Sequence, residues 1–332
     1  MECVVAVDVG GTTMKGGLVA RDGTILHFER RVTPRAEGAD RVIAAISAFV
    51  ADLARPRTIA HPATIAHPAT DVHPATAVRP GIEVRPVAVG LAVPGLVTAT
   101  HAVFSAAFGW RDVPASAFTD VDLPVALGHD VRSAGEAELA YGAGGENVLF
   151  LPIGTGIAGA VVLSGSLYGG AGGWAGQIGH IPVWPDGLAC GCGQQGCLAA
   201  YASGSAVATR GGADTAEEVV RRAAAGEPRA AEVWGEAVEA LALALATYTL
   251  LLDPTRIVIG GGVAQAGDAL LVPLRARLAA RLAFRQPPEV LASSLGVRAG
   301  LMGAALLGTR LLDGPAAGSA VQVGGQVHEA RP

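Results

Sequence analysis

Two segments of the chain share one pattern, an apolar run followed by a glycine–threonine turn and a second apolar run. The first reads VVAVDVGGTTMKGGLV from Val4, and the second reads VLFLPIGTGIAGAVVL from Val148. Short apolar runs separated by Gly-rich turns predict paired strands. The chain has 332 residues, which exceeds the size of one hydrophobic core, and the pattern occurs in both halves. We therefore expect two α/β domains around a cleft.

Further patterns fill in the two domains. The predicted elements of the first half are an antiparallel meander of strands at 4–9, 14–20 and 25–32, a helix at 41–53 and a buried strand at 87–93. The second half predicts strands at 147–153, 158–163 and 256–259 and helices at 215–225, 229–252 and 301–312. We expect a smaller domain of residues 1–116, completed by the helix at about 300–314, and a larger domain of residues 117–299.

Two segments lack the pattern of a packed domain. Residues 55–86 contain a near-repeat in which His61, His67 and His73 recur with proline at every sixth position, which excludes a helix or a central strand. We predict an exposed, disordered-like insertion here, and favour a solvated spacer over a metal-binding histidine tract. The Ala/Gly-rich residues 315–332 predict a disordered tail.

The net charge of the chain limits the classes of binding partner that we expect. A formal net charge of −5 with scattered Lys and Arg argues against nucleic acid or an anionic membrane and favours a small molecule. The N-terminus shows no secretory signal pattern. The most apolar helix, at 237–252, is too short to span a bilayer, so we expect a cytoplasmic protein. Cys3 lies on an apolar strand and reads as a small buried hydrophobe.

The glycine–threonine turns are suited to phosphate. Glycines let backbone N–H groups approach a phosphate, hydroxyls and a Lys add donors, and an Asp can hold the hydration shell of Mg²⁺. The residues concerned are Asp8, Gly10, Gly11, Thr12, Thr13 and Lys15 in the first turn and Gly154, Thr155 and Gly156 in the second. A plain Asp-Gly hairpin is the alternative for the first turn. Gly261 and Gly262 follow a strand where backbone packs against an adenosine, and a tight strand-to-helix turn is an equal alternative.

Asp130 is the candidate catalytic base. It stands at the start of an amphipathic helix, in LGHDVRSAGEAELAYGAG, where simple N-capping is the alternative role. A carboxylate in this place could orient an acceptor hydroxyl and take its proton during phosphoryl transfer. The neighbouring Glu136 and Glu138 read as solvated helix residues, and we assign them none of the chemistry.

The densest motif is GHIPVWPDGLACGCGQQGC. It brings His180 together with Cys190, Cys192 and Cys197 in C-x-C-x4-C spacing. One imidazole and three thiolates form a closed tetrahedral zinc site, which leaves no open position for water and is therefore structural. Its binding energy would order a Gly-rich loop.

At this point the residues resemble the ROK family of bacterial sugar kinases, sugar-responsive repressors and uncharacterised relatives. The resemblance runs through DVGGTTMK, GLAVPGLV, GWRDVP, GHDVRSAGEAELAYGAG, IGTGIAGA, GQIGHI and CGCGQQGCLAAYAS. It implies a two-domain actin-like, ribonuclease H-like ATPase fold of the actin, hexokinase and Hsp70 kind, ATP with Mg²⁺, a structural zinc, Asp130 as base and a homodimer. It also implies a substrate site that includes Gly95, His129, Asp130, Gln177 and His180.

The departures from the family pattern concern the acceptor. His129 stands where Asn is common, Gln177 replaces a carboxylate that grips sugar hydroxyls, and Ala199 and Ala107 replace Glu and Asn. The resemblance implies a kinase for a hydroxyl of a hexose, at a primary O6-like position. The alternatives are a C7-cyclitol kinase of the 2-epi-5-epi-valiolone type and a sugar-binding relative without turnover. A DNA-reading regulator is disfavoured because the first strand begins at residue 4.

Overall fold

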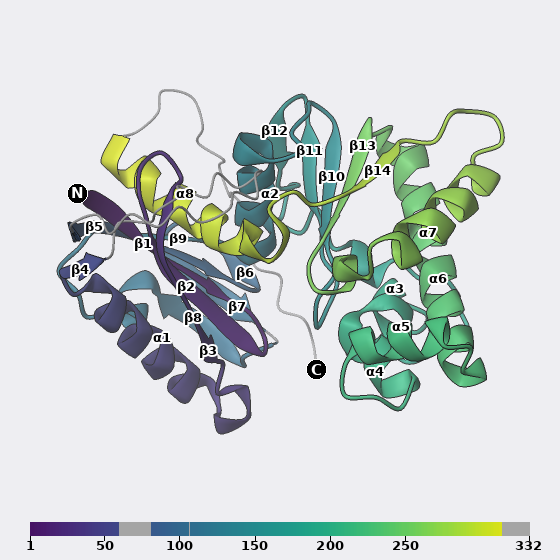
Figure 1. The fold of residues 1–332 in the computed structure, drawn as a ribbon, viewed down its shortest axis with the longest axis horizontal. Coiled ribbons are helices and arrows are strands. Elements are labelled where there is room, and N and C mark those ends of the chain that lie inside the picture. The colour runs from purple at the N-terminus through teal and green to yellow at the C-terminus, as the bar shows by residue number, and fades with distance from the viewer. Residues whose placement is uncertain (60–80, 106, 314–332) are drawn as a thin grey trace. The chain divides into compact units, whose positions relative to one another are not determined.

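The computed structural model describes residues 1–59, 81–105 and 107–313 (Figure 1). Its contacts divide the chain into two compact units. Unit 1 contains residues 1–137, 169–175 and the chain from 298 onward, and unit 2 contains residues 138–168 and 176–297. His61, His67 and His73 and the predicted tail at 315–332 lie outside the described residues.

Unit 1 is built on a six-stranded sheet in the order β3-β2-β1-β5-β4, with β9 also paired to β5. Its elements are β1 (Glu2–Val9), β2 (Thr13–Val19), β3 (Ile25–Val32), η1 (Arg35–Glu37), α1 (Ala39–Ala54), β4 (Arg57–Ile59), β5 (Ile82–Val93), η2 (Ala115–Phe118), β9 (Val125–His129), the start of α2 (Asp130–Tyr141) and α8 (Ala299–Asp313). A smaller three-stranded sheet contains β6 (Leu96–Val97), β7 (His101–Ser105) and β8 (Trp110–Pro114). The predicted meander and the helix after it are confirmed.

Two predicted boundaries differ from the structure. The insertion was expected to span 55–86, but β4 pairs with the first residues of β5, so both ends of that range belong to the sheet. The second domain was expected to begin at residue 117. Instead β9 pairs in parallel with β5 through Val89–Val93, and this ladder keeps β9 and Asp130 within unit 1. Both differences come from strand pairs that join residues far apart in sequence.

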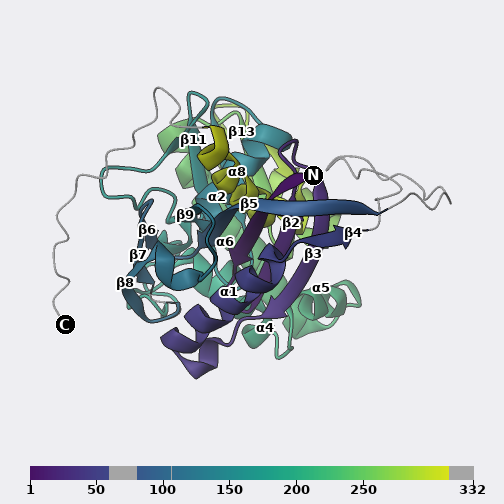
Figure 2. The ribbon, with the colours of Figure 1, turned by 90° about the vertical axis from the view of Figure 1, so that its left-hand side faces the viewer.

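Helices cover both faces of the central strands of unit 1, which explains why β1 is buried from Cys3 to Val9 (Figure 2). The adjacent glycines of β2 show the two faces. A side chain at Gly16 would meet Phe49 of α1, and one at Gly17 would approach Leu301 of α8. Because neighbouring strand residues point to opposite faces, α1 and α8 lie on opposite sides of the sheet.

Unit 2 repeats this topology with a five-stranded sheet in the order β12-β11-β10-β13-β14. Its elements are β10 (Val148–Pro152), β11 (Ala160–Leu163), β12 (Ser166–Tyr168), η3 (Ile178–His180), α3 (Leu198–Ala202), α4 (Gly204–Arg210), α5 (Ala216–Ala224), α6 (Pro228–Leu252), β13 (Arg256–Gly260), η4 (Val263–Ala266), α7 (Asp268–Arg281), β14 (Glu289–Ala292) and, at its end, η5 (Gly296–Arg298). Each unit thus has an antiparallel meander followed by parallel strands. The duplication expected from the two glycine–threonine turns is present in the fold.

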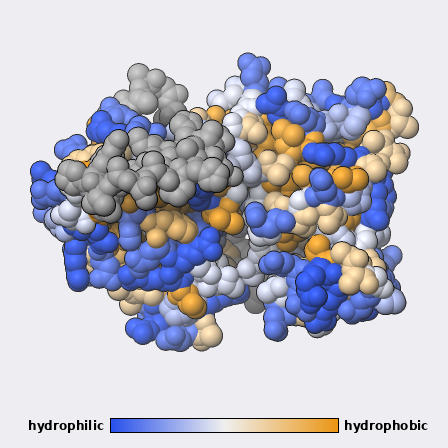
Figure 3. Space-filling view, in the orientation of Figure 1, coloured by the Kyte–Doolittle hydropathy of each residue, from blue (hydrophilic) through white to orange (hydrophobic). Residues whose placement is uncertain are grey.

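Helix α6 is the central helix of the unit 2 core. Its 25 residues are long and apolar enough to cross a membrane by length and composition, which corrects the shorter span expected from sequence. However, Val233, Leu241 and Leu245 are fully buried in the core cluster, and α6 contacts α3, α5 and α7. On the face drawn in Figure 3, hydrophilic residues lie among the apolar ones. We interpret α6 as a core helix.

A glycine in β5 sets the approach of α8 to the sheet. A Cβ at Gly90 would lie 1.8 Å from the Ala304 carbonyl oxygen and 2.9 Å from the Gly308 nitrogen. These are backbone atoms of a packed helix and cannot move aside cheaply. We predict that Gly90→Ala lowers the free energy of unfolding by about 3 kcal/mol, at the upper end for overpacking.

Gly235 provides the matched control for this prediction. It lies inside α6, and its Cβ would have no neighbour closer than 4.0 Å. Gly235→Ala should therefore stabilise the protein by about 0.5–1 kcal/mol through helix propensity. Urea titration of both variants measures the difference, and equal effects would contradict the packing argument.

Candidate functional site

The first glycine–threonine turn lies at the carboxyl end of β1 in unit 1. Asp8 and Lys15 stand opposite each other in the β1–β2 ladder, and the Lys15 Nζ donates to the Asp8 carboxylate at 3.0 Å. Between them the Gly10 N–H donates to the Thr13 carbonyl at 3.1 Å, which closes the turn. The loop therefore presents a fixed carboxylate, an ammonium group and backbone amides within a few residues.

Thr33 tethers this turn and was missed by the sequence analysis. Its hydroxyl donates to the Gly10 carbonyl at 2.8 Å, and its N–H donates to the Thr12 carbonyl at 3.0 Å. Thr33 is buried, so these bonds are shielded from water. It follows β3 without any motif, and only the pairing of β2 with β3 brings it to the turn.

The N-terminal turn of α8 also contacts Asp8. A Cβ at Gly300 would lie 2.2 Å from an Asp8 carboxylate oxygen, so only glycine allows this approach. Helix N-termini carry partial positive charge and favour a carboxylate. The sequence analysis expected this helix but gave Gly300 no role, because a helix starting near the end of the chain shows no link to Asp8.

Asp130 begins α2 directly after β9, and β1, β5 and β9 run parallel to one another. Its Oδ1 accepts a hydrogen bond from the Val131 N–H at 2.7 Å. Burial, together with the charge of Asp8, raises the pKa of Asp130 to about 7, although the Val131 N–H, Lys15 and Arg132 act in the opposite direction. A carboxyl group with this pKa can be deprotonated at neutral pH and still accept a proton readily.

His129 stands before Asp130 and is neutral. Burial and the charge of Arg132 lower the pKa of His129 to about 3. Its Nδ1 accepts a hydrogen bond from the Arg132 N–H at 3.3 Å, which leaves the proton on Nε2. The 3.3 Å approach of this Nδ1 to Asp130 is therefore not an ion pair. Gly95, at the turn between β5 and β6, has φ of 116° and no room for a side chain against Phe104.

Glu138 corrects one expectation from the sequence. It was read as a solvated helix residue, but it is only 3% exposed. Its carboxylate accepts hydrogen bonds from the Ser293 hydroxyl and from the N–H groups of Leu295 and Ala143, the last two at 3.3 Å. Glu138 therefore fixes the segment after β14 to the end of α2 within unit 2. Glu136 is partly exposed and pairs with Arg310.

The second glycine–threonine turn lies in unit 2 beside the glycine triplet. β10 and β13 are parallel, and their ladder ends at Pro152 opposite Gly260. The Gly204 N–H donates to the Gly154 carbonyl at 2.7 Å, and the Ser205 hydroxyl donates to the Thr155 carbonyl at 2.6 Å. The turn at 154–156, the start of α4 and the turn at 261–262 therefore meet at one edge of the sheet.

Several of these glycines have no steric need to be glycine. Gly11, Gly154, Gly156 and Gly262 have no atom within 4 Å of the position a Cβ would take. Gly261 differs, because its φ is 77° and a Cβ would lie 2.4 Å from the Ile153 carbonyl. Open space over the other four is what a closely approaching ligand requires. Gly261 instead fits the tight-turn alternative.

The predicted metal ligands gather in one place. The Nδ1 or Nε2 of His180 and the sulfurs of Cys190, Cys192 and Cys197 all lie within 4.8 Å of one another. The Cys192 and Cys197 sulfurs are 3.8 Å apart, and the Cys190 sulfur is 3.8 Å from the His180 Nδ1. A tetrahedral zinc with Zn–S bonds of about 2.3 Å requires a sulfur separation of about 3.8 Å. The donor set fits this ion.

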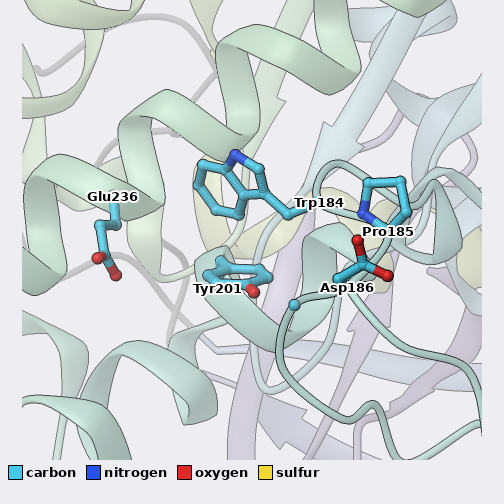
Figure 4. A pocket seen from close by; sticks show the side chains of 6 residues that line it. Trp184, Pro185, Asp186, Tyr201 and Glu236 are labelled. Atoms are coloured by element: carbon cyan, nitrogen blue, oxygen red, sulfur yellow. The ribbon is translucent and has the colours of Figure 1, made fainter.

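Two aromatic residues brace the cysteine loop (Figure 4). Trp184 and Tyr201 pack edge to face at 4.4 Å, and the Tyr201 hydroxyl accepts the Leu188 N–H at 2.7 Å. Together with Asp186 and Glu236 they line a cavity of about 470 Å³. None of the sequence-predicted site residues lines this cavity. The cavity is therefore separate from the sequence-predicted site residues.

Gln177 is the N-cap of the short helix η3, and His180 is its last residue. The His180 N–H donates to the Gln177 carbonyl at 3.0 Å, so the two residues are held within one turn. Because the His180 Nδ1 faces the cysteine sulfurs, its Nε2 is available to another partner. Both residues are in unit 2, whereas Asp8, Gly95, His129 and Asp130 are in unit 1.

Comparison with known proteins gives the family. A model of the ROK family matches residues 81–310, more than half of the chain. The chain belongs to the ROK family. Its glucokinase relative from Streptomyces coelicolor is 30% identical over 336 residues, which cover 92% of this chain and 97% of that enzyme. A kanosamine kinase from Amycolatopsis mediterranei is 37% identical over 238 residues, covering 66% of this chain and 76% of that one.

Solved ROK structures share the fold. The ROK family glucokinase from Streptomyces griseus, in complex with glucose and AMPPNP, superposes with a TM-score of 0.75 and 30% identity, covering 92% of this chain and 99% of that chain. The ROK hexokinase from Thermus thermophilus gives a TM-score of 0.71, also at 30% identity, covering 94% of this chain and 98% of that one. The actin-like α/β fold expected from the resemblance is confirmed.

The buried carboxylate of Glu138 gives a test of the structure around α2. Glu138→Ala removes the acceptor of one hydroxyl and two N–H groups, and we predict a loss of about 3 kcal/mol in the free energy of unfolding. Glu136→Ala, on the same helix, removes a partly exposed ion pair and should cost less than about 1 kcal/mol. Urea unfolding distinguishes them. Equal losses would contradict a special role for Glu138.

Proposed function

We propose that this ROK protein is an ATP-dependent kinase that transfers a phosphoryl group to a hydroxyl of a sugar or sugar-like molecule. The curated relatives named above act on glucose or kanosamine by their names, and others are N-acetylmannosamine kinases. The observation that carries the proposal is that Asp130 and the Asp8–Lys15 turn stand at the ends of parallel strands of one sheet in unit 1, where burial and the charge of Asp8 raise the pKa of Asp130 to about 7. A general base near neutrality is what hydroxyl phosphorylation needs.

ATP is the proposed phosphoryl donor. The backbone amides at Gly10 to Thr13 and the Lys15 ammonium are suited to phosphate oxygens, as are the open glycines of the 154–156 turn. The turn at Gly261 and Gly262 is the proposed contact of the adenosine, with Gly261 fixing the conformation of the turn and Gly262, which has open space around it, meeting the ligand. Mg²⁺, when bound, would neutralise phosphate charge, and Asp8 is the residue suited to hold its water shell.

The acceptor is proposed to be a hexose or a hexose-like molecule, phosphorylated at a primary, O6-like hydroxyl. Asp130 would accept the proton of that hydroxyl while the oxygen attacks phosphorus. The neutral His129 would donate through Nε2, and Gln177 and the Nε2 of His180 would contact other hydroxyls. Gly95 would bring its backbone close to the acceptor.

Two alternatives rest on the altered acceptor residues. Gln177 and Ala199 lack the carboxylates of the family pattern, and each lost charged hydrogen bond would cost about 1.5–3 kcal/mol with an unchanged hexose. A C7-cyclitol of the 2-epi-5-epi-valiolone type is one alternative acceptor. A sugar-binding protein without turnover is the second, and the presence of Asp130 in the same unit as the Asp8–Lys15 turn supports the kinase over it.

We further propose that His180, Cys190, Cys192 and Cys197 hold a structural zinc ion. The closed set of four donors leaves no position for a reacting water. The glycine-rich segment between these ligands has little core of its own, and Cys192 is exposed. Metal binding would therefore supply much of the order of this loop.

Zinc analysis tests this second proposal. The purified protein should contain close to one zinc per chain by elemental analysis, and Cys192→Ser should lose most of it and lower Tm. Cys3→Ser is the control, because Cys3 lies buried in β1 away from the four ligands in sequence, and should retain the metal. Full zinc content in Cys192→Ser would contradict the assignment.

The kinase proposal is tested by Asp130→Asn with a panel of hexoses, amino sugars and cyclitols. We expect kcat/KM to fall by about 10²–10⁴-fold, the usual contribution of a general base. In the wild type the carboxyl group must be deprotonated to act. Because its pKa is raised to about 7, kcat/KM should fall about tenfold per pH unit below that value and level off above it.

Asp122→Asn is the matched control for this experiment. Asp122 is an exposed carboxylate on the segment before β9, and its loss should leave kcat/KM and the pH profile unchanged. A coupled ADP-release assay from pH 5.5 to 8.5 measures both variants. A wild type that turns over none of the acceptors, or an active Asp130→Asn, would refute the proposed mechanism.

A further inference from the structure

The segment Gly169–Ala175 belongs to unit 1, although the residues on either side of it belong to unit 2. It is mostly glycine, and Gly170 and Gly173 both have positive φ. It also carries Trp174, whose side chain is 55% exposed. Its internal backbone bonds join Ala175 to Gly169 at 3.1 Å and Gly173 to Gly170 at 3.4 Å. Such a segment loses much conformational entropy on ordering and needs an external anchor.

Arg132 supplies a contact of this kind. Its Nη2 donates to the Gly173 carbonyl at 3.1 Å, and its Nη1 lies 3.3 Å from the position of a Cβ at Gly169. The guanidinium therefore lies along the segment, close to Gly169 and Gly173. The segment also touches β6, because a Cβ at Gly173 would lie 3.2 Å from the Leu96 side chain.

Arg132 also stands beside the proposed base. It lies in the first turn of α2, two residues after Asp130, and its N–H is bonded to the His129 Nδ1. Its charge acts against the raised pKa of Asp130. An arginine is suited to contact both the loop and the surroundings of Asp130, because its planar guanidinium group offers several N–H donors and stays protonated.

We propose that Arg132 is a positioning residue for the acceptor, which holds the loop Gly169–Ala175 against the helix that carries Asp130. The inference rests on the proposed kinase function. The loop runs directly into Gln177, a proposed acceptor contact, and lies on Leu96, which follows Gly95. Release of the loop would therefore loosen the acceptor residues at both places while the phosphate turn keeps its own bonds to Thr33.

Limited proteolysis with chymotrypsin tests whether Arg132 holds the loop, and it does not depend on kinase activity. Chymotrypsin should cleave after Trp174 at least tenfold faster in Arg132→Ala and Arg132→Gln than in the wild type, with the fragments identified by mass. Cleavage after the exposed Phe284 in unit 2 is the internal reference and should not change. Arg310→Ala, which removes an exposed arginine of unit 1, should cleave like the wild type.

Steady-state kinetics report on the positioning. In Arg132→Gln, assayed at pH 8.5 so that Asp130 stays deprotonated after loss of the Arg132 charge, the acceptor KM should rise at least tenfold, with the ATP KM within twofold of the wild type and kcat within threefold. Arg132→Lys, which keeps the charge without the planar guanidinium group, should lie between wild type and Arg132→Gln in both assays.

Two outcomes would overturn the inference. If chymotrypsin cleaves after Trp174 at the wild-type rate in both Arg132→Ala and Arg132→Gln, then Arg132 does not anchor the loop. Faster cleavage with an unchanged acceptor KM would mean that the loop does not position the acceptor. An inactive wild type would instead refute the kinase proposal, and the cleavage rates would still decide the anchor.

Discussion

The site in unit 1 depends on holding two carboxylates close enough to repel each other, Asp8, which is buried, and Asp130, which is partly buried. Each belongs to a strand end, and the parallel ladders of β1, β5 and β9 fix the spacing of those ends. Their mutual repulsion is offset by Lys15, by the N-terminal turn of α8 and by Arg132. The sheet holds the charges together, and the surrounding cations and amides make this arrangement tolerable.

In unit 2 the corresponding glycine–threonine turn is held by different contacts. Unit 2 has no buried pair of carboxylates at this turn, and the 154–156 segment is instead held through its carbonyls by Gly204 and Ser205. The Gly154 N–H closes the turn on the Gly156 carbonyl at 3.0 Å, and the space over Gly154 and Gly156 stays open. The proposed metal ligands gather on a second loop of this unit, and the Tyr201 hydroxyl, with Trp184 packed on its ring, also bonds that loop at Leu188. Neither loop has a hydrophobic core of its own, so hydrogen bonds and side-chain packing from neighbouring residues hold each of them in place.

Many features of the fold and the candidate site could be predicted from the sequence, because each depends on residues close together in the chain. The meander, the glycine–threonine turns, the place of Asp130 at a helix start and the cysteine spacing all lie within short windows. Thr33, Gly300 and Arg132 were not found, because their roles depend on partners that strand pairing or helix packing brings from elsewhere. Glu138 was misread for the same reason, since Ser293 and Leu295, which bury and satisfy its carboxylate, come much later in the chain. The domain boundary was misplaced because β9 pairs backward onto β5.

The packing of α8 on β1 and β5 has a consequence for synthesis on the ribosome. The glycines that receive this helix are translated long before residues 299–313, so one face of the first sheet stays uncovered while the whole of unit 2 is made. Contacts of such large sequence separation form late and slowly. The nascent chain therefore exposes an apolar face of the first sheet until residues 299–313 are made, and such exposed surface favours chaperone binding before release from the ribosome.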